Sequence, residues 1–169
     1  RPGLALYAPF PGVFEDLEDA MAFVSVLDQV KVVPAGARVG YGGTFVAERE
    51  TRVGIVPAGY ADGVPRSLSG RGRVLVNGAE APILGRVSMD LTAVDLTDLS
   101  PAPGPGAEVL FFGEHGGARL PVADTAERAG TVSWEVLCGV GPRVPRVILE
   151  GGRETCVVSR FFGSPERAR

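Results

Sequence analysis

Two short motifs place residues that could do acid–base and anion chemistry next to glycines. Arg-Pro-Gly at residues 1–3 offers a guanidinium and open backbone amides, and Val-Gly-Tyr-Gly-Gly-Thr at residues 39–44 offers a phenol on a segment that can be approached closely. Lys31 is the only lysine in the 169 residues. A site that combines these groups with a lysine must take that lysine from elsewhere, so we expect the motifs to form half of an active site.

The composition is typical of one globular domain with a core of its own. Hydrophobic residues make up 45% and charged residues 22% of the chain. A net charge of −3 argues against a nucleic-acid partner, which would require clustered positive charge. No apolar stretch approaches the length of about 20 residues that a membrane helix needs, so we expect no membrane span and a cytoplasmic location.

The two cysteines, Cys138 and Cys156, lack C-x-x-C spacing and lie in apolar segments. We expect them to be buried free thiols, as in a cytosolic protein, and we expect no metal site. The single histidine, His115, lies in a glycine-rich loop and is expected at the surface, and Lys31 is expected to be a solvated strand position.

Short apolar runs separated by glycine and proline predict a mainly β, barrel-like fold with a short helical insertion. Asn77-Gly78 supplies the two positive-φ residues of a type I′ hairpin turn. Alternation predicts a strand over residues 86–96, with Val87, Met89 and Leu91 on one face. The other expected elements are helical turns over 15–23, a helix over 122–129 that ends at Gly130, a second helix over 131–140, and strands over 24–33, 44–48, 51–57, 108–112, 143–149 and 155–159.

Five motifs in order resemble the C-terminal part of alanine racemases, which are pyridoxal 5′-phosphate enzymes. They cover nearly the whole chain, so the combination is far more specific than any one of them. The motifs are Arg-Pro-Gly-Leu at 1–4, Gly-Tyr-Gly-Gly-Thr at 40–44, Gly-Tyr-Ala-Asp-Gly at 59–63, Gly-Arg-Val-Ser-Met-Asp at 85–90, and Ser-Trp-Glu-Val at 133–136 leading to Pro-Arg-Val-Pro-Arg at 142–146.

The resemblance implies a two-domain enzyme that interconverts L-alanine and D-alanine for peptidoglycan synthesis. An N-terminal (β/α)8 barrel would hold the cofactor on a lysine outside this chain, with residues 1–10 as the end of that barrel and residues 11–169 as the C-terminal β domain. The family implies a head-to-tail homodimer whose sites are shared between subunits. We therefore expect the chain to be part of a longer protein and to be inactive alone.

Racemisation requires removal of a proton from one face of the α-carbon and its return on the other, which favours two separate acid–base groups. By resemblance, Tyr41 is the group opposite the cofactor-bearing lysine. A phenol is a weak base near neutral pH, so positive charge or hydrogen bonds must assist it.

Four residues are implied in cofactor binding. Arg1 matches the arginine that faces the pyridine nitrogen, and because arginine keeps its proton it can only donate a hydrogen bond there. Gly3 and Leu4 match backbone amides that hold the phosphate. Trp134 stands where the family usually has a tyrosine whose hydroxyl contacts the phosphate, so either its indole N–H replaces that donor or one phosphate contact is lost.

Five residues are implied around the substrate. Met89 matches a residue whose backbone N–H contacts the substrate carboxylate, with Arg86 and Asp90 at the same corner. Tyr60 and Asp62 match residues at the entrance to the site.

Two other hypotheses remain open on the sequence alone. One is a racemase of the same architecture with another substrate, such as serine, or with broad specificity. The other is a non-catalytic β-barrel interaction module, since a β domain without its barrel would expose apolar surface.

Overall fold

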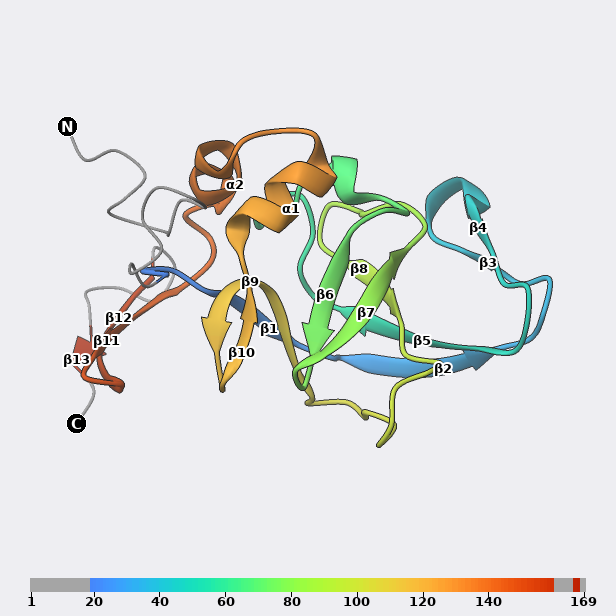
Figure 1. The fold of residues 1–169 in the computed structure, drawn as a ribbon, viewed down its shortest axis with the longest axis horizontal. Coiled ribbons are helices and arrows are strands. Elements are labelled where there is room, and N and C mark those ends of the chain that lie inside the picture. The colour runs from blue at the N-terminus through green and yellow to red at the C-terminus, as the bar shows by residue number, and fades with distance from the viewer. Residues whose placement is uncertain (1–18, 160–165, 168–169) are drawn as a thin grey trace.

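A computed structural model describes residues 19–159 and 166–167. The segments are mostly short strands, with helical turns η2 and η3 and helices α1 and α2 (Figure 1). Their bounds are β1 Phe23–Val26, β2 Gln29–Val33, β3 Arg38–Val39, η2 Tyr41–Gly43, β4 Phe45–Val46, β5 Thr51–Val56, η3 Arg66–Leu68, β6 Arg73–Val76, β7 Ala79–Leu84, β8 Thr92–Asp95, β9 Glu108–His115, β10 Ala118–Leu120, α1 Val122–Ala129, α2 Ser133–Gly139, β11 Arg146–Glu150, β12 Arg153–Val158 and β13 Glu166–Arg167.

The main sheet is antiparallel and curls into a half-barrel. Its strand order is β1-β9-β6-β7-β8-β5-β2, and β10 pairs with β9 as the eighth strand. β1 and β2 lie at opposite ends of this order, yet only Leu27 and Asp28 separate them in the chain. Because the step from Val26 to Gln29 spans only about 10 Å, the end of β1 must lie near the start of β2. The expected barrel-like β fold is therefore confirmed, and Figure 1 shows β1 running almost directly into β2.

The core lies inside this curl. Along β6 and β8 every second residue is buried, which is the pattern of a strand with one face inward. Phe112 of β9 and Leu27 at the β1–β2 junction are among the largest fully buried side chains. The helices α1 and α2 lie at one end of the curl (Figure 1) and add Val122, Ala126 and Val136 to the same core.

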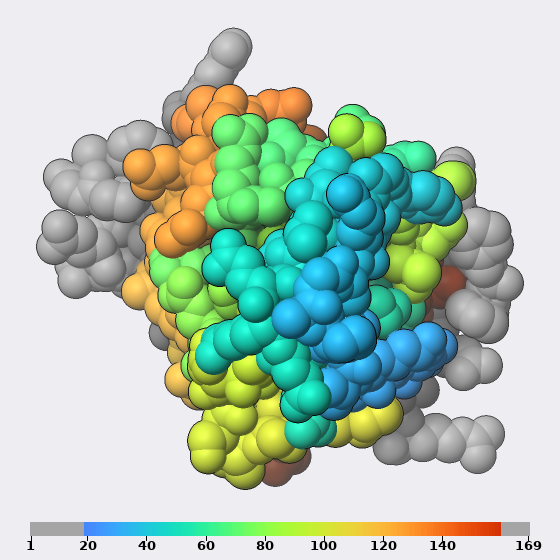
Figure 2. All heavy atoms as spheres, turned by 90° about the vertical axis from the view of Figure 1, so that its right-hand side faces the viewer, coloured from blue at the N-terminus to red at the C-terminus, as the bar shows by residue number. Residues whose placement is uncertain are grey.

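A small two-stranded ribbon, β3 paired with β4, stands outside the main sheet. The turn η2 connects its two strands. Figure 2 views the molecule from the ribbon's end, where the blue and cyan atoms of residues from β2 to β4 lie at the front. The ribbon thus presents its turn at the periphery of the domain.

Several local predictions are confirmed. Asn77 and Gly78 have φ values of 48° and 83°, and they join β6 to β7 as the predicted hairpin turn. Helix α1 has the predicted bounds, and Gly130 ends it in the left-handed conformation with a φ of 74°. The second predicted helix corresponds to α2. Lys31 is exposed on β2, and His115 is exposed at the end of β9.

The predicted strand over 86–96 is wrong for its first half. Only Thr92–Asp95 forms a strand, and residues 86–91 form a loop. The predicted strand face with Val87, Met89 and Leu91 is also wrong. Thr92 and Val94 point into the core, and Met89 is exposed. Sequence alternation alone does not reveal that the hydrogen bonds of residues 88 and 89 go to another loop rather than to a neighbouring strand.

The prediction of buried cysteines is wrong. Cys138 and Cys156 are free, but Cys138 is exposed and Cys156 is half-buried. Near Cys138 the buried side chains are Val136 and Val140, and no residue of β12, the strand of Cys156, is fully buried. The helical turns predicted over 15–23 begin outside the described residues, and Phe23 opens β1 instead. None of the helices described within residues 19–159 is long and apolar enough to cross a membrane.

The hairpin turn can be tested by replacing Gly78 with alanine. A Cβ at Gly78 has room, with Ala118 Cβ 3.7 Å away, but the φ of 83° disfavours any L side chain. We expect Gly78→Ala to lower the free energy of unfolding by about 1–2 kcal/mol in urea denaturation of the full-length protein. Gly104→Ala is the control, since that glycine has open space and no positive φ, and it should cause no loss. Equal losses in the two variants would contradict the turn assignment.

Candidate functional site

Tyr41 opens the turn η2 at the tip of the β3–β4 ribbon and is the most exposed large apolar or aromatic side chain described, at 73%. Its glycine neighbours shape the turn, because Gly40 and Gly42 have φ values of 77° and 72° that L side chains rarely adopt. Among the described residues, no hydrogen bond is formed by the Tyr41 hydroxyl. The phenol is therefore displayed on the surface with its oxygen open to another group.

The Tyr41 turn is packed against the start of the 85–91 loop. A Cβ at Gly85 would lie 2.7 Å from the Val39 carbonyl oxygen, and a Cβ at Gly40 would lie 3.1 Å from the Arg86 nitrogen. A Cβ at Gly42 would lie 3.3 Å from Nη1 of Arg86, so this guanidinium flanks the tyrosine turn. The structure thus brings two motifs that are 45 residues apart into backbone contact.

The end of the same loop binds the segment at residues 59–63. The backbone N–H of Tyr60 donates to the Ser88 carbonyl at 3.0 Å, and that of Ala61 donates to the Met89 carbonyl at 3.0 Å. Gly59 is required at this point, because a Cβ there would lie 2.4 Å from both carbonyl oxygens. Met89 and Tyr60 are consequently held on adjacent loops, and both side chains are about half exposed.

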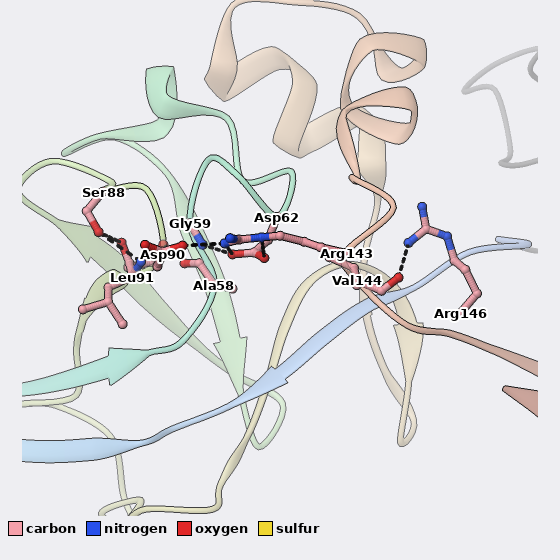
Figure 3. Close-up of polar contacts among 10 residues, drawn as sticks. Ala58, Gly59, Asp62, Ser88, Asp90, Leu91, Arg143, Val144 and Arg146 are labelled. Atoms are coloured by element: carbon pink, nitrogen blue, oxygen red, sulfur yellow. Dashed lines mark hydrogen bonds and ion pairs between the residues drawn. The ribbon is translucent and has the colours of Figure 1, made fainter. Parts of the chain in front are cut away.

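Asp62 and Asp90 share one guanidinium, that of Arg143 (Figure 3). Arg143 Nε donates to Asp62 Oδ1 at 2.6 Å, and its Nη2 donates to Asp62 Oδ2 at 2.9 Å and to Asp90 Oδ1 at 2.6 Å. Asp62 Oδ2 also accepts the Gly59 N–H at 2.9 Å. The arginine thereby connects the segment after α2 to both loops.

The two carboxylates raise the pKa of Arg143 above its ordinary value, with the hydrogen bond to Asp62 as the largest cause and that to Asp90 next. Because the pKa of Arg143 is raised in the folded protein, its ion pairs stabilise the fold at every pH below the ordinary arginine pKa. Arg143 is therefore cationic throughout the neutral range. Sequence reasoning included Arg143 in the matched Pro-Arg-Val-Pro-Arg motif but assigned it no role. An arginine between two prolines was the available signal.

Helix α2 and the 59–67 region enclose a groove of about 360 Å³. Tyr60 and Arg66 line one side, and Thr131, Glu135 and Val136 line the other. The helix is anchored close by, since a Cβ at Gly63 would lie 2.5 Å from Val140 Cα. Trp134 is on this helix and half exposed. In Figure 1, helix α2 and the β3–β4 ribbon that carries Tyr41 lie on opposite sides of the domain.

Of the ten residues selected from the sequence, seven are described. The 85–91 loop contacts both the Tyr41 turn and the Tyr60–Asp62 segment, and Trp134 lies on the helix that flanks the latter. Arg1, Gly3 and Leu4 lie outside the described residues, so their placement stays a prediction.

The comparisons with known proteins agree on one family. The family model described as alanine racemase, C-terminal domain, matches residues 20–148. A catabolic alanine racemase of Rhizobium johnstonii is 47% identical over 149 residues, and an alanine racemase of Clostridium novyi is 38% identical over 157 residues. These alignments cover 86% and 90% of this chain, but only 38% and 41% of the relatives.

Solved structures give the same result. A Streptomyces lavendulae alanine racemase is 42% identical with a TM-score of 0.80, and the match covers 88% of this chain and 40% of that one. A Bartonella henselae alanine racemase with covalently bound pyridoxal phosphate is 34% identical with a TM-score of 0.76, covering 82% and 38%. A Bacillus anthracis alanine racemase with bound L-Ala-P is 31% identical with a TM-score of 0.82, covering 93% and 41%.

The close approach of the two loops predicts a strong effect of Gly59→Ala. The new Cβ would meet two backbone oxygens, which cannot move as a side chain can, so we expect a loss of about 1–3 kcal/mol in the free energy of unfolding. Gly139→Ala is the nearby control, because its Cβ would lie 3.9 Å from the closest carbonyl and alanine favours the helix α2. Chemical denaturation of the full-length variants measures both. A Gly59→Ala variant as stable as Gly139→Ala would contradict the loop packing.

Proposed function

The chain belongs to the family of alanine racemase C-terminal domains, and from this we propose that it is the part of an alanine racemase that supplies an acid–base tyrosine to the active site. The chain spans about two fifths of the length of the curated relatives it matches. The activity, substrate and partners of the whole protein are accordingly part of the proposal. It interconverts L-alanine and D-alanine.

The observation that carries the proposal is the display of Tyr41. Its phenol is exposed, and its turn is fixed on a loop that also positions Met89 and Tyr60. A core or purely structural tyrosine would bury its ring or bond its hydroxyl. Tyr41 takes the α-proton of L-alanine and gives a proton back to the same face in the reverse direction.

The described residues fit a partial pyridoxal phosphate site. Trp134 offers an indole N–H at the surface, and with Arg1, Gly3 and Leu4 it is proposed to bind the phosphate and ring nitrogen of the cofactor in the barrel of its own subunit. Tyr41 offers a hydroxyl, which is proposed to face the cofactor in the barrel of the partner subunit. When bound, this cofactor stabilises negative charge on the α-carbon of an amino acid. The only lysine, Lys31, is exposed on β2 and belongs to none of these motifs. The lysine that holds the cofactor is therefore proposed to come from an N-terminal barrel domain.

Substrate binding is assigned to the loop at residues 85–91. The Met89 backbone N–H donates to the substrate carboxylate, and its side chain limits the size of the substrate. Arg86 and Asp90 lie beside it on the same loop, and Arg86 adds positive charge near Tyr41. Tyr60 and Asp62 form the entrance from the adjacent loop.

The proposed whole protein is a head-to-tail homodimer. Residues 1–10 end its barrel and residues 11–169 form the β domain, which projects Tyr41 into the partner subunit's barrel. The isolated chain is then inactive, because it lacks the second acid–base group. By family likeness the enzyme works in the bacterial cytoplasm and provides D-alanine for peptidoglycan.

Two other functions would give different results. A serine or broad-specificity racemase would turn over larger amino acids as well as alanine. A non-catalytic interaction module would make no use of the Tyr41 hydroxyl. The identity to alanine racemases, including 47% with the Rhizobium johnstonii enzyme, favours alanine.

Removing the phenol oxygen tests the proposal directly. In the full-length enzyme, Tyr41→Phe should lower kcat for L- to D-alanine by roughly 100- to 10,000-fold, because one of the two acid–base groups is lost. In deuterated water, exchange at the α-carbon of D-alanine should persist, since the group on the other face remains. Racemisation at the unchanged rate would refute the catalytic assignment.

The origin of the lysine is tested by Lys31→Met. This residue is exposed and belongs to none of the matched motifs, so kcat and KM should stay within about twofold of the unchanged enzyme. Steady-state kinetics in both directions measure this. A loss as large as that of Tyr41→Phe would place the essential lysine in this chain and contradict the shared site.

A further inference from the structure

We propose that Arg143 is a positioning residue for the substrate-binding loop, acting through Asp62 and Asp90 without contacting the substrate. The inference rests on the proposed racemase function for its kinetic test, but its structural basis stands apart. One guanidinium joins three segments that the chain order separates: the 59–63 loop, the 85–91 loop and the segment after α2.

The geometry of the Arg143 cluster is unlike that of an ordinary surface ion pair. The Asp62 side chain is only 15% exposed, and both of its oxygens accept hydrogen bonds from Arg143 in a fork. Asp62 Oδ2 in addition accepts the Gly59 N–H. The Asp62 carbonyl accepts the Gly141 N–H at 3.2 Å, which adds a second connection to the segment that carries Arg143.

The cluster lies directly beside the backbone bonds that position Met89. Tyr60 and Ala61 donate to the carbonyls of residues 88 and 89, so these two bonds lie between Gly59 and Asp62 on one side and Asp90 on the other. Arg143 joins Asp62 on one loop to Asp90 on the other (Figure 3). Without this connection, the loops would be joined by two backbone bonds, each with one exposed and one half-buried residue, and bonds near the surface open more readily.

A guanidinium is suited to this position. Its planar fork binds Asp62 at two oxygens and still reaches Asp90, whereas a lysine ammonium is a point charge on a flexible stem. Arg143 remains cationic at all working pH values, as its raised pKa implies. Deprotonation of Arg143 therefore does not alter the geometry of the loops in this pH range.

The consequence for the reaction is separable from that of Tyr41. Arg143 connects to the Met89 side of the 85–91 loop, while the Tyr41 turn contacts its Gly85–Arg86 side. Displacing Met89 weakens binding of the substrate carboxylate, which is held in the ground state as well as in the transition state. Such a loss raises KM and changes kcat little.

The kinetic test uses Arg143→Gln in the full-length holoenzyme with L-alanine and D-alanine as substrates. We expect KM to rise roughly tenfold or more while kcat stays within about threefold. Arg143→Lys should recover part of the loss in KM because it restores the charge but not the fork. Arg49→Gln is the matched control, since it removes an arginine whose ion pair with Asp98 is exposed on both sides, and its kinetics should not change.

A second readout does not depend on catalysis. Amide hydrogen exchange of residues 59–61 should become roughly tenfold faster in Arg143→Gln, while amides of β5 and β9 keep their protection. Should Arg143→Gln fail to fold, the same two measurements on Arg143→Lys decide the matter, with smaller shifts in the same direction.

The outcomes separate this inference from the proposed function. Unchanged KM and unchanged exchange at residues 59–61 would overturn the positioning role, as would a fall in kcat at constant KM. If the unmodified protein does not racemise alanine, the proposed function fails, yet faster exchange confined to these loops would still support the positioning of the 85–91 loop by Arg143.

Discussion

The close approach of three backbones around the 85–91 loop is the constraint on which the site depends. Glycine is required on both sides of the loop, because any Cβ at Gly85 or Gly59 would overlap a carbonyl oxygen of the neighbouring loop. Contacts of this kind leave little freedom for sliding, since backbone atoms cannot rotate away as side chains do. They fix the Tyr41 turn relative to Met89, and Met89 relative to Tyr60, although the three motifs lie on different parts of the fold.

The curled sheet makes this convergence possible. The β1–β2 link holds the end of one edge strand near the start of the other, and the loops that carry the site contact one another on the resulting half-barrel. The Tyr41 ribbon is outside the sheet, and its turn packs against the start of the 85–91 loop. A rigid, buried core with polar groups on its loops is a common arrangement for sites that act on a ligand held by another domain. The Tyr41 side chain is exposed while close backbone contacts hold its turn against the 85–91 loop.

The ion pairs of Arg143 hold the same loops together in addition to the backbone contacts. Arg143 brings a third segment to the same place and balances two carboxylates, one of which is mostly buried. Without the arginine, the carboxylates of Asp62 and Asp90 would repel each other. The charge of the cluster and the geometry of the loops are thus coupled, which is why a residue remote from Tyr41 in the sequence bears on the same site.

The sequence by itself determined the local features and the family. Turn conformation and helix capping are short-range properties, so a few residues each encode the Asn77-Gly78 turn and the bounds of α1. The order of the five motifs can be read directly along the chain. The Arg143 cluster, the loop at residues 86–91 and the exposure of Cys138 were decided by tertiary structure. Met89 alternates as a strand residue would, but its carbonyl binds Ala61, 28 positions away. No local pattern specifies a partner at that distance in the sequence, since the curled sheet of the folded domain is what brings these two loops together.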